Sequence, residues 1–278
     1  MKINKVSIIG NGFVGNALYQ NFKNNITTYV YDISPERCLN TLDECFKTDL
    51  IFVCLPTPMK SVEGGDCNLN ILNKFFADIP LNTEGIFVIK STVPIGTTRS
   101  LQEFRKDLKI LHNPEFLTAA NAIEDFKNSE RNIIGGNLVW TKTVEEFFKQ
   151  ILPNTPNILV SSDESETIKY FSNTFLALKV AYFNQVFDLT QTLGLDYNSI
   201  VAGITSDSRI GRSHTKTPGP DGDRGFGGTC FPKDINALIH TLKKLNLDVK
   251  LLESVWEYNK SIRTNWDWAD SKSAVNND

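Results

Sequence analysis

Short apolar runs rich in β-branched and aromatic residues alternate with longer amphipathic stretches over the first 160 residues. The alternation predicts buried strands separated by helices, because a parallel strand that is covered on both faces is apolar throughout. We therefore expect an α/β domain of the Rossmann type at residues 1–162, a parallel sheet with helices on both faces. The predicted strands are residues 5–10, 27–32, 50–56, 86–92, 109–114 and 132–136.

The pattern changes near Asp163, where apolar positions recur at helical spacing. A long helix is predicted to begin at this acidic, serine-rich stretch and to end at Gly194. We expect residues 163–278 to form an all-helical second domain, joined to the first by a helix and not by a flexible linker. Its further predicted elements are helices at 196–205, at 232–247 and from Leu251 to Trp268, and a glycine-rich polar loop at 206–229.

Composition limits the classes of function. The chain has 278 residues, of which 41% are hydrophobic and 22% charged, as in a globular protein with a sizeable core. The 29 basic and 32 acidic residues nearly balance, which argues against a general nucleic-acid binder. No apolar run approaches the roughly 18 residues of a membrane span. Five cysteines without CxxC spacing argue against a disulfide framework or a metal site. We expect a cytoplasmic protein with free thiols and no metal, nucleic-acid or membrane partner.

Three glycines follow the apolar strand residues KVSII (5–9) and lead into a helical pattern. Gly10 permits a tight turn, Gly12 lets the backbone approach a pyrophosphate, and Gly15 lets the helix pack against the strand. The N-terminus of that helix would face the phosphates with unpaired N–H groups. Glycine-rich turns also occur without a nucleotide, but a strand, a helix and a correctly spaced acid together favour a dinucleotide site.

Asp32 is the spaced acid, since it ends the second predicted strand about twenty residues after the glycines. Its carboxylate can accept hydrogen bonds from the adenosine ribose and would repel a 2′-phosphate, so NAD is favoured over NADP. Arg37 follows closely and can meet either the adenosine edge or a 2′-phosphate.

Cys230 carries a second chemical signal. It follows a glycine pair and precedes a predicted helix that has Pro232 in its first turn. The helix N-terminus and Lys233 are both expected to lower the pKa of the thiol and so to favour the nucleophilic thiolate. Asp234 lies in the same turn, where it can reach a catalytic water or amine. A lone cysteine is more often a small buried residue, and we assign that role to Cys38, Cys45 and Cys54.

At these residues the chain resembles the nucleotide-sugar dehydrogenases of the UDP-glucose/GDP-mannose dehydrogenase family. The resemblance covers essentially the whole chain, because several blocks occur in the family's order and at similar separations. Blocks in a shared order are far more specific than any single motif. They are GNGFVG (10–15), CLPTP (54–58), KSTVPIGTT (90–98), NPEFL (113–117), IKYFSNTFLALKVAYFN (168–184) and GFGGTCFPKD (225–234).

The resemblance implies an NAD-dependent oxidation of the C6 alcohol of UDP-glucose to UDP-glucuronate in two hydride transfers. Cys230 would form a thiohemiacetal and then a thioester, which water cleaves. The resemblance implies catalytic roles for Cys230, Lys169, Asp234, Asn173, Thr92 and Glu115. It implies cofactor contacts for Gly10, Gly12, Phe13, Val14, Gly15, Asp32, Arg37, Pro56, Thr57 and Thr92. Substrate contacts are implied for Glu115, Phe116, Leu117, Lys169, Asn173, Phe226, Gly227 and Gly228.

Residue spacing agrees with part of this assignment. Lys169 and Asn173 are four residues apart, so they share one face of the long predicted helix and interrupt an apolar surface. Lys169 can supply positive charge to a developing oxyanion. The alternative is a lysine that extends along the helix to solvent. The 206–229 loop has basic residues that suit a diphosphate, unless it is simply a solvated charged loop; they are Arg209, Arg212, Lys216 and Arg224.

Two departures from the family pattern are evident. Ala119 stands where the family usually has a glutamate, so a polar contact near the nicotinamide is missing or comes from a group such as Asn121. The family also continues into a third domain that covers the UDP, whereas this chain stops at Asp278. We expect either a shortened form or a naturally compact member, in which the uridine-diphosphate end of the site is less enclosed.

Two other functions stay open. A β-hydroxyacid dehydrogenase of the 6-phosphogluconate or 3-hydroxyisobutyrate type pairs a Rossmann domain with helices at this length, but its chemistry needs no cysteine. A non-catalytic NAD-binding remnant is the second alternative. The intact residues Cys230, Lys169, Asn173 and Asp234 weigh against such a loss of function.

We also expect a homodimer that forms through the helical domain. The last predicted helix aligns apolar residues on one stripe, and little sequence remains to cover it. The family resemblance points the same way, since its members pair through the central helices. The alternative is a monomer in which this helix folds back on its own domain. The stripe consists of Leu252, Val255, Trp256, Asn259 and Ile262.

Overall fold

The computed structural model describes residues 2–118 and 120–275, and the chain divides into two compact units. The first unit comprises Met1–Thr57 and Leu69–Lys169, and the second comprises Pro58–Asn68 and Tyr170–Asp278. The short segment Pro58–Asn68 therefore belongs to the second unit although it lies far from the rest of that unit in the sequence. The boundary predicted between residues 162 and 163 stays a prediction.

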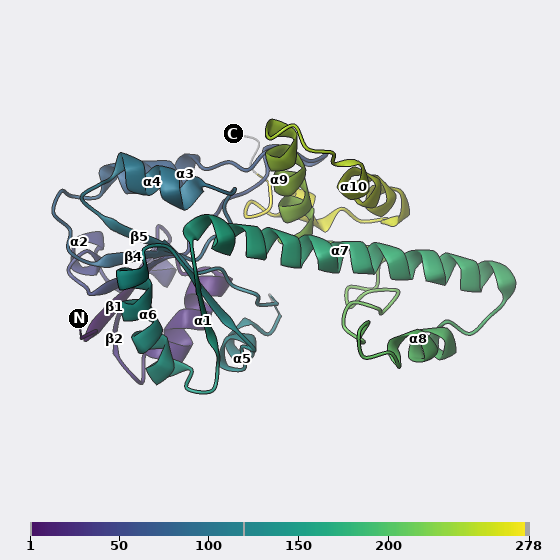
Figure 1. Ribbon diagram of the computed structural model, residues 1–278, viewed down its shortest axis with the longest axis horizontal. Coiled ribbons are helices and arrows are strands. Elements are labelled where there is room, and N and C mark those ends of the chain that lie inside the picture. Colours follow the sequence, from purple (N-terminus) through teal and green to yellow (C-terminus); the bar gives the residue numbers. More distant parts are fainter. Residues whose placement is uncertain (1, 119, 276–278) are drawn as a thin grey trace. The chain divides into compact units, whose positions relative to one another are not determined.

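The first unit is built on a seven-stranded sheet in the order β2-β1-β3-β4-β5-β6-β7 (Figure 1). All neighbouring strands are parallel except β5 and β6, which pair antiparallel at His112 and Gly135. The predicted α/β fold is confirmed, with this one antiparallel pair as a difference. The strands are β1 (Lys5–Ile9), β2 (Thr27–Tyr31), β3 (Leu50–Val53), β4 (Ile86–Ile89), β5 (Lys109–His112), β6 (Asn132–Gly135) and β7 (Asn157–Val160).

Strand β7 was not predicted from the sequence. It has four residues and forms the edge of the sheet, and its side chains are half-buried or exposed. Three of its four residues are apolar, but a run of this length cannot be distinguished from a turn of helix by its pattern alone.

Helices cover both faces of the sheet, as expected. One face packs α1 (Phe13–Phe22), α5 (Ala122–Lys127) and α6 (Leu138–Ile151) around a core that includes Phe22 and Phe52. The other face packs α2 (Leu42–Cys45), α3 (Asn70–Asp78) and α4 (Thr97–Phe104). The chain leaves β1 and β3 toward opposite edges of the sheet, so the crevice at their carboxyl ends is the topological switch point where such folds bind ligands.

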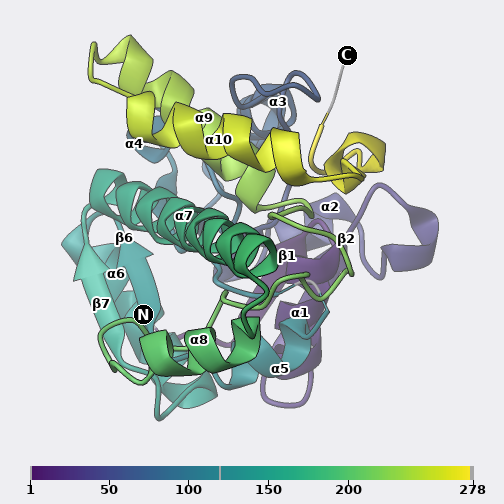
Figure 2. The same ribbon diagram turned by 90° about the vertical axis from the view of Figure 1, so that its right-hand side faces the viewer.

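Among its described residues, the second unit has four α-helices: α7 (Ser162–Leu193), whose first two turns belong to the first unit, α8 (Tyr197–Thr205), α9 (Phe231–Lys244) and α10 (Lys250–Ile262). Helix α7 ends at Leu193, directly before Gly194, whose φ of +64° suits the helix end that the sequence predicts there. Residues 206–230 contain neither helix nor strand. Helices α9 and α10 lie side by side (Figures 1 and 2).

The last helix is shorter than predicted, because α10 ends at Ile262 and not at Trp268. The Asp223 carboxylate accepts hydrogen bonds from the backbone N–H groups of Thr264 and Asn265, at 3.1 and 2.9 Å, and these bonds replace the next helical turn. Trp268 lies in a short 3₁₀ turn at Asp267–Asp270 and is fully buried.

The stripe on α10 is also not the uncovered surface that we expected. Val255, Trp256 and Asn259 are 8%, 4% and 0% exposed, and they are buried within their own unit. The indole N–H of Trp256 donates to the carbonyl of Glu63 at 3.0 Å. The segment Pro58–Asn68 therefore covers a surface that the sequence pattern left open.

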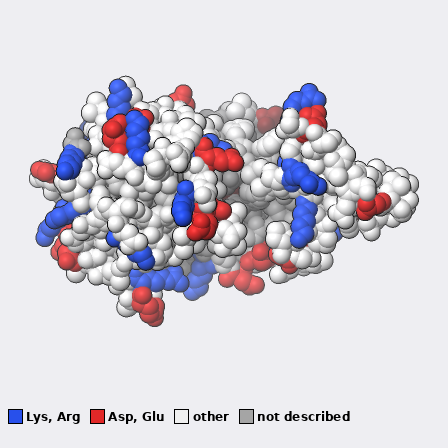
Figure 3. Space-filling model, turned by 90° about the horizontal axis from the view of Figure 1, so that it is seen from below, with Lys and Arg blue, Asp and Glu red and all other residues white. Residues whose placement is uncertain are grey.

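The balanced composition of charged residues is also visible on the surface. Acidic and basic side chains are interspersed on the face seen in Figure 3. Among the described residues, no helix combines the length and the apolar character that crossing a membrane requires.

Candidate active site

The glycine turn after β1 has the geometry that the sequence predicts. Gly10 has a φ of +92°, and a Cβ atom there would lie 2.6 Å from the carbonyl oxygen of Cys54. A Cβ atom on Gly15 would overlap the carbonyl oxygen of Gly10, so only glycine lets α1 lie this close to the turn. A Cβ atom on Gly12 would meet no other atom within 4 Å, which leaves space for a ligand at the start of α1.

Asp32 lies at the end of β2, beside this turn. Its carboxylate accepts hydrogen bonds from the backbone N–H groups of Asn11, at 2.6 Å, and Ser34, at 2.8 Å. The Asn11 side chain donates to the carbonyl of Arg37 at 2.8 Å, and the Arg37 side chain is exposed. The half-buried carboxylate, the open position at Gly12 and the free helix start fit a dinucleotide with ribose hydroxyls at Asp32.

The remaining predicted cofactor residues lie around the same strand ends. Phe13 and Val14 begin α1, and Phe13 is 36% exposed. After β3, Pro56 is exposed, whereas the hydroxyl of Thr57 donates to the carbonyl of Thr92 at 2.7 Å. This bond joins the segments that follow β3 and β4.

Glu115 and Lys169 form a buried ion pair in the first unit. The Lys169 ammonium donates to the carbonyl oxygen of Glu115 at 2.5 Å and to its carboxylate at 3.2 Å, and Lys169 is only 2% exposed. Lys169 therefore does not extend to solvent. Its ammonium lies 5.1 Å from the centre of the Phe116 ring, and the backbone N–H of Leu117 donates to the Glu115 carboxylate at 2.6 Å. The structure thus brings four of the predicted site residues together.

Two further buried side chains that were not predicted for the site, Lys90 and His112, lie close enough to this pair for the charges to interact. The Lys90 ammonium donates to the side-chain oxygen of Asn113 at 2.7 Å, and burial lowers the pKa of Lys90 to about 8. His112 contacts the Ser165 hydroxyl at 2.8 Å, and burial lowers the pKa of His112 to about 3, so the ring is neutral. A lysine and a histidine that directly end apolar strands were the available signal.

Cys230 is the residue that immediately precedes α9 in the second unit, and the hydroxyl of Thr229 lies 3.8 Å from its sulfur. All five cysteines are free thiols. Burial raises the pKa of the Cys45 and Cys54 thiols to about 12, which keeps them protonated. The half-buried Cys230 at a helix N-terminus lies in a different environment.

Asp234 is fully buried in the first turn of α9, and both of its carboxylate oxygens are bonded. One accepts from the Lys233 ammonium at 2.5 Å and the other from the Asn173 amide at 2.6 Å. Burial lowers the pKa of Lys233, but the charges of Asp234 and Cys230 outweigh burial and raise it above its ordinary value. Lys233 is therefore a permanent cation close to the Cys230 sulfur.

The glycine loop before Cys230 is held by residues that the sequence analysis placed elsewhere. The Asn259 side chain bonds both the N–H, at 2.7 Å, and the carbonyl, at 2.9 Å, of Phe226, whose ring is buried in the core of the unit. The Asp267 carboxylate accepts from the N–H of Gly228 at 3.0 Å. A Cβ atom on Gly227 would overlap the Arg263 guanidinium. Asn259, Arg263 and Asp267 recur every four residues in the sequence, and this spacing of polar residues was the signal for the role.

The basic residues of the 206–229 loop are only partly available for an anion. Arg209 pairs with Asp207 at 2.6 Å, and Arg224 pairs with Asp188 at 2.6 Å. Arg212 and Lys216 are exposed. Ala119, the departure from the family pattern, lies outside the described residues, and Asn121 precedes α5 with an exposed side chain.

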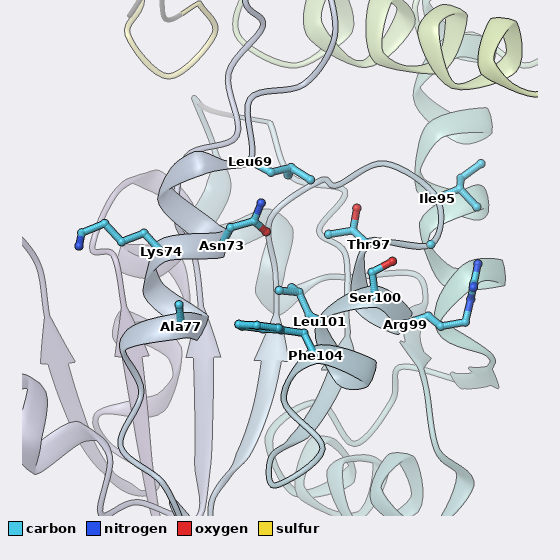
Figure 4. Close-up of a pocket in the computed structure, with 11 residues that line it drawn as sticks. Leu69, Asn73, Lys74, Ala77, Ile95, Thr97, Arg99, Ser100, Leu101 and Phe104 are labelled. Atoms are coloured by element: carbon cyan, nitrogen blue, oxygen red, sulfur yellow. The ribbon is translucent and has the colours of Figure 1, made fainter.

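A cavity of about 690 Å³ lies between α3 and α4 in the first unit (Figure 4). Asn73 and Ala77 on α3 line it on one side, and Thr97, Leu101 and Phe104 on α4 line it on the other. None of the predicted site residues lines this cavity, so it is separate from the candidate active site.

Comparison with known proteins gives the same family in both parts of the chain. Residues 37–152 match the NAD binding domain of the UDP-glucose/GDP-mannose dehydrogenase family, and residues 163–261 match its central domain. A UDP-glucose 6-dehydrogenase of Rickettsia bellii is 36% identical over 229 residues, which are 78% of this chain and 50% of the relative. The chain thus spans about half the length of the curated relatives it matches.

Solved structures agree on the fold. A UDP-glucose dehydrogenase from Pyrobaculum islandicum matches with a TM-score of 0.79 at 26% identity, over 94% of this chain and 68% of that one. A 3-hydroxyisobutyrate dehydrogenase of Mycobacterium tuberculosis matches with a TM-score of 0.71 over 94% of each chain, but at 16% identity it shares the fold alone. The two family domains cover most of the residues and confirm both the predicted resemblance and the predicted NAD-binding domain. This chain belongs to the UDP-glucose/GDP-mannose dehydrogenase family.

Proposed function

We propose that this chain carries the catalytic residues of a nucleotide-sugar dehydrogenase, which oxidises the C6 alcohol of UDP-glucose to a carboxylate with NAD. The observation that carries the proposal is the position of Cys230 at the start of α9, beside the charges of Lys233 and Asp234. A dehydrogenase that removes one hydride needs no cysteine. Oxidation to an acid requires the aldehyde to be held between two oxidations, and a thiolate does this by forming a covalent bond.

The ends of the first strands supply the cofactor site in this proposal. The start of α1 at Gly12 would hold the pyrophosphate, and Asp32 would accept the ribose hydroxyls. Bound NAD would supply the hydride acceptor for both oxidations. The other residues proposed to contact the cofactor are Gly10, Phe13, Val14, Gly15, Arg37, Pro56, Thr57 and Thr92.

Lys169 and Glu115 are proposed to act on the sugar oxygen and on water. A buried ammonium stabilises negative charge on oxygen, because it is already oriented and little water screens it. The Glu115 carboxylate and the Thr92 hydroxyl would hold or activate the water that cleaves the thioester. Phe116 and Leu117 are proposed to contact the sugar nucleotide.

Cys230 is proposed as the nucleophile. Its thiolate adds to the aldehyde carbon, so that a C–S bond forms and the carbonyl electron pair moves to oxygen. Oxidation of this thiohemiacetal leaves a thioester. Water then adds to the thioester carbon and the C–S bond breaks, which returns the thiolate and releases the carboxylate. Asp234 would take part in the proton transfers, and Asn173 would hold its carboxylate in place through the hydrogen bond that its amide donates.

The substrate would also contact the glycine loop of the second unit. Because the ring and backbone groups of Phe226 are engaged within the unit, we propose that Gly227 and Gly228 offer the closer approach to a sugar nucleotide. The exposed Arg212 and Lys216 suit the diphosphate by charge.

A homodimer through α7 is the proposed assembly. Exposed apolar side chains repeat along this helix at Phe175, Tyr182 and Leu189, which are 64%, 56% and 57% exposed. A spacing of seven residues is typical of a helix that packs along a second helix. A second copy of the chain would cover this row. The free cysteines favour a reducing compartment, and we propose the cytoplasm.

NADH formation over a panel of UDP-sugars, GDP-sugars, 6-phosphogluconate and 3-hydroxyisobutyrate tests the proposal. UDP-glucose is expected to yield two NADH per molecule of acid. Cys38→Ser, which changes a thiol remote from α9 in the sequence, is the matched control for Cys230→Ser and is expected to be fully active. Turnover of a hydroxyacid with one NADH per molecule would contradict the proposal, and NAD binding without turnover of any compound would favour a non-catalytic protein.

A further inference from the structure

Glu166 is a fully buried acid on α7 that the proposed reaction does not use. One carboxylate oxygen accepts the N–H of Gly96 at 2.6 Å, and the other accepts the N–H and the hydroxyl of Thr98, at 2.8 and 2.6 Å. Gly96 immediately precedes α4, which no side chain of its own segment caps. Glu166 therefore caps the N-terminus of α4 from a position 68 residues away in the sequence.

The same residue lies one helical turn before Lys169. Residues three apart share a face of a helix, so a bond that fixes Glu166 also limits how α7 can rotate or shift at Lys169. On the other side, Gly96 ends the loop that begins after β4 and contains Thr92. Glu166 thus connects the helix that carries Lys169 to the loop that carries Thr92.

The contacts that hold α4 in place differ in strength. The cavity between α3 and α4 borders Thr97, Leu101 and Phe104, and on this side Phe104 is 65% exposed (Figure 4). A second link between the helices, the ion pair of Arg99 with Asp163 at 3.1 Å, is solvent-exposed and contributes little. The cap formed by Glu166 is buried, unlike this ion pair, and it joins α4 to the first turns of α7.

The charge of Glu166 fits this role. Burial raises the pKa of Glu166 to about 7, although the bonds from Thr98 and Gly96 favour the carboxylate and lower it. The ionised form accepts all three bonds, whereas the protonated form carries an O–H donor that finds no acceptor in the two N–H groups it faces. The three bonds therefore hold the carboxylate at the start of α4 against the cost of its burial.

We propose that Glu166 is a positioning residue for the oxidation, which holds Lys169 against Glu115 by locking α7 to the N-terminus of α4. This inference rests on the proposed function. Loss of the lock would leave the fold and the cofactor residues at the ends of β1 and β2 in place. Without this contact, the ion pair between Lys169 and Glu115 would be open for part of the time.

The test compares Glu166→Gln with Glu164→Gln. Glutamine keeps the shape but turns one acceptor into a donor that faces a backbone N–H, and Glu164 is an exposed cap of the same helix, bonded to the N–H of Ser161 at 2.7 Å. Acetylation of Lys169 by an amine reagent, read by mass spectrometry, is expected to be about tenfold faster in Glu166→Gln, because the variant loses hydrogen bonds that a charged group accepts. Glu164→Gln should label like the wild type.

Kinetics supply the second readout. In an active protein, Glu166→Gln should lower kcat for NADH formation about tenfold and leave the KM for NAD unchanged. Equal Lys169 labelling in the two variants, or a loss confined to the KM for NAD, would overturn the inference. If Glu166→Gln does not fold, Thr98→Val removes one bond of the cap, and unchanged labelling there would also overturn it. If the wild type oxidises no sugar, the proposed function fails, while the labelling still decides the role of Glu166.

Discussion

The glycine turn allows two substitutions to be compared directly. Gly15→Ala should lower the stability of the protein, whereas Gly12→Ala should weaken the binding of NAD and leave the stability unchanged. The methyl group of Gly15→Ala would overlap the carbonyl oxygen of Gly10 and lie 3.1 Å from the Ile8 side chain. Either α1 must move away from β1 or the turn must open. The methyl group of Gly12→Ala meets no protein atom within 4 Å, so it occupies only the space proposed for the pyrophosphate.

The magnitudes follow from these surroundings. Overpacking against backbone costs roughly 1–3 kcal/mol, and the better helix propensity of alanine returns at most about 1 kcal/mol in Gly15→Ala. A net loss of about 1–2 kcal/mol lowers Tm by about 2–8 °C for a protein of this size. Gly12→Ala should leave Tm unchanged and weaken NAD binding at least about tenfold, which corresponds to about 1.4 kcal/mol.

Thermal melting by circular dichroism and calorimetric titration with NAD measure the two effects on the same samples. Gly203→Ala is the control, because this glycine of α8 also has nothing within 4 Å and lies in the other unit. It should change neither NAD affinity nor, by more than a small gain, Tm. Wild-type NAD affinity in Gly12→Ala would refute the proposed pyrophosphate position, and wild-type Tm in Gly15→Ala would refute the packing argument.

Three further predictions concern chemistry, assembly and pH. Cys230→Ser should abolish acid production because a serine alkoxide is far scarcer than a thiolate at neutral pH; full acid production, measured by chromatography, would contradict the nucleophile. Phe175→Glu should reduce the mass measured by light scattering toward 31.2 kDa with little change in Tm. Trp256→Glu should instead lower Tm, because this ring is in the core. An unchanged mass in Phe175→Glu would contradict the α7 dimer. His112 has a folded pKa of about 3, below its ordinary 6.5, so its contribution to stability is present above pH 6.5 and is lost as pH falls toward 3. Denaturation midpoints across that range should fall less in His112→Asn than in the wild type, and equal slopes would show that the buried ring is not responsible.

Much of the first unit could be predicted from local sequence. The central strands are apolar throughout, and the glycine turn with Asp32 uses backbone conformations that few other residues adopt. Local sequence did not predict the edge strand β7 or the antiparallel pairing of β5 with β6, because the pairing partner of a short strand depends on contacts between distant segments.

In the second unit, the sequence predicted the helices but not the contacts that they make. Helical spacing predicted α10, but its end and its cover come from Asp223 and from the segment Pro58–Asn68, which are remote in the sequence. Asn259 therefore holds the glycine loop and does not face a partner. Amphipathic spacing marks which residues lie on one face and leaves open what covers that face.

The sequence by itself determined the parts that depend on neighbours along the chain: the strand and helix periods, the glycine turn, and the place of Cys230 at a helix N-terminus. Only the tertiary structure decided that Lys169 is buried against Glu115, 54 residues away, and that Glu166 caps α4. The physical reason is that a charged side chain on a helix is equally compatible with solvent and with a buried partner. The fold decides between the two by bringing a hydrogen-bonding partner close enough to offset the cost of burial.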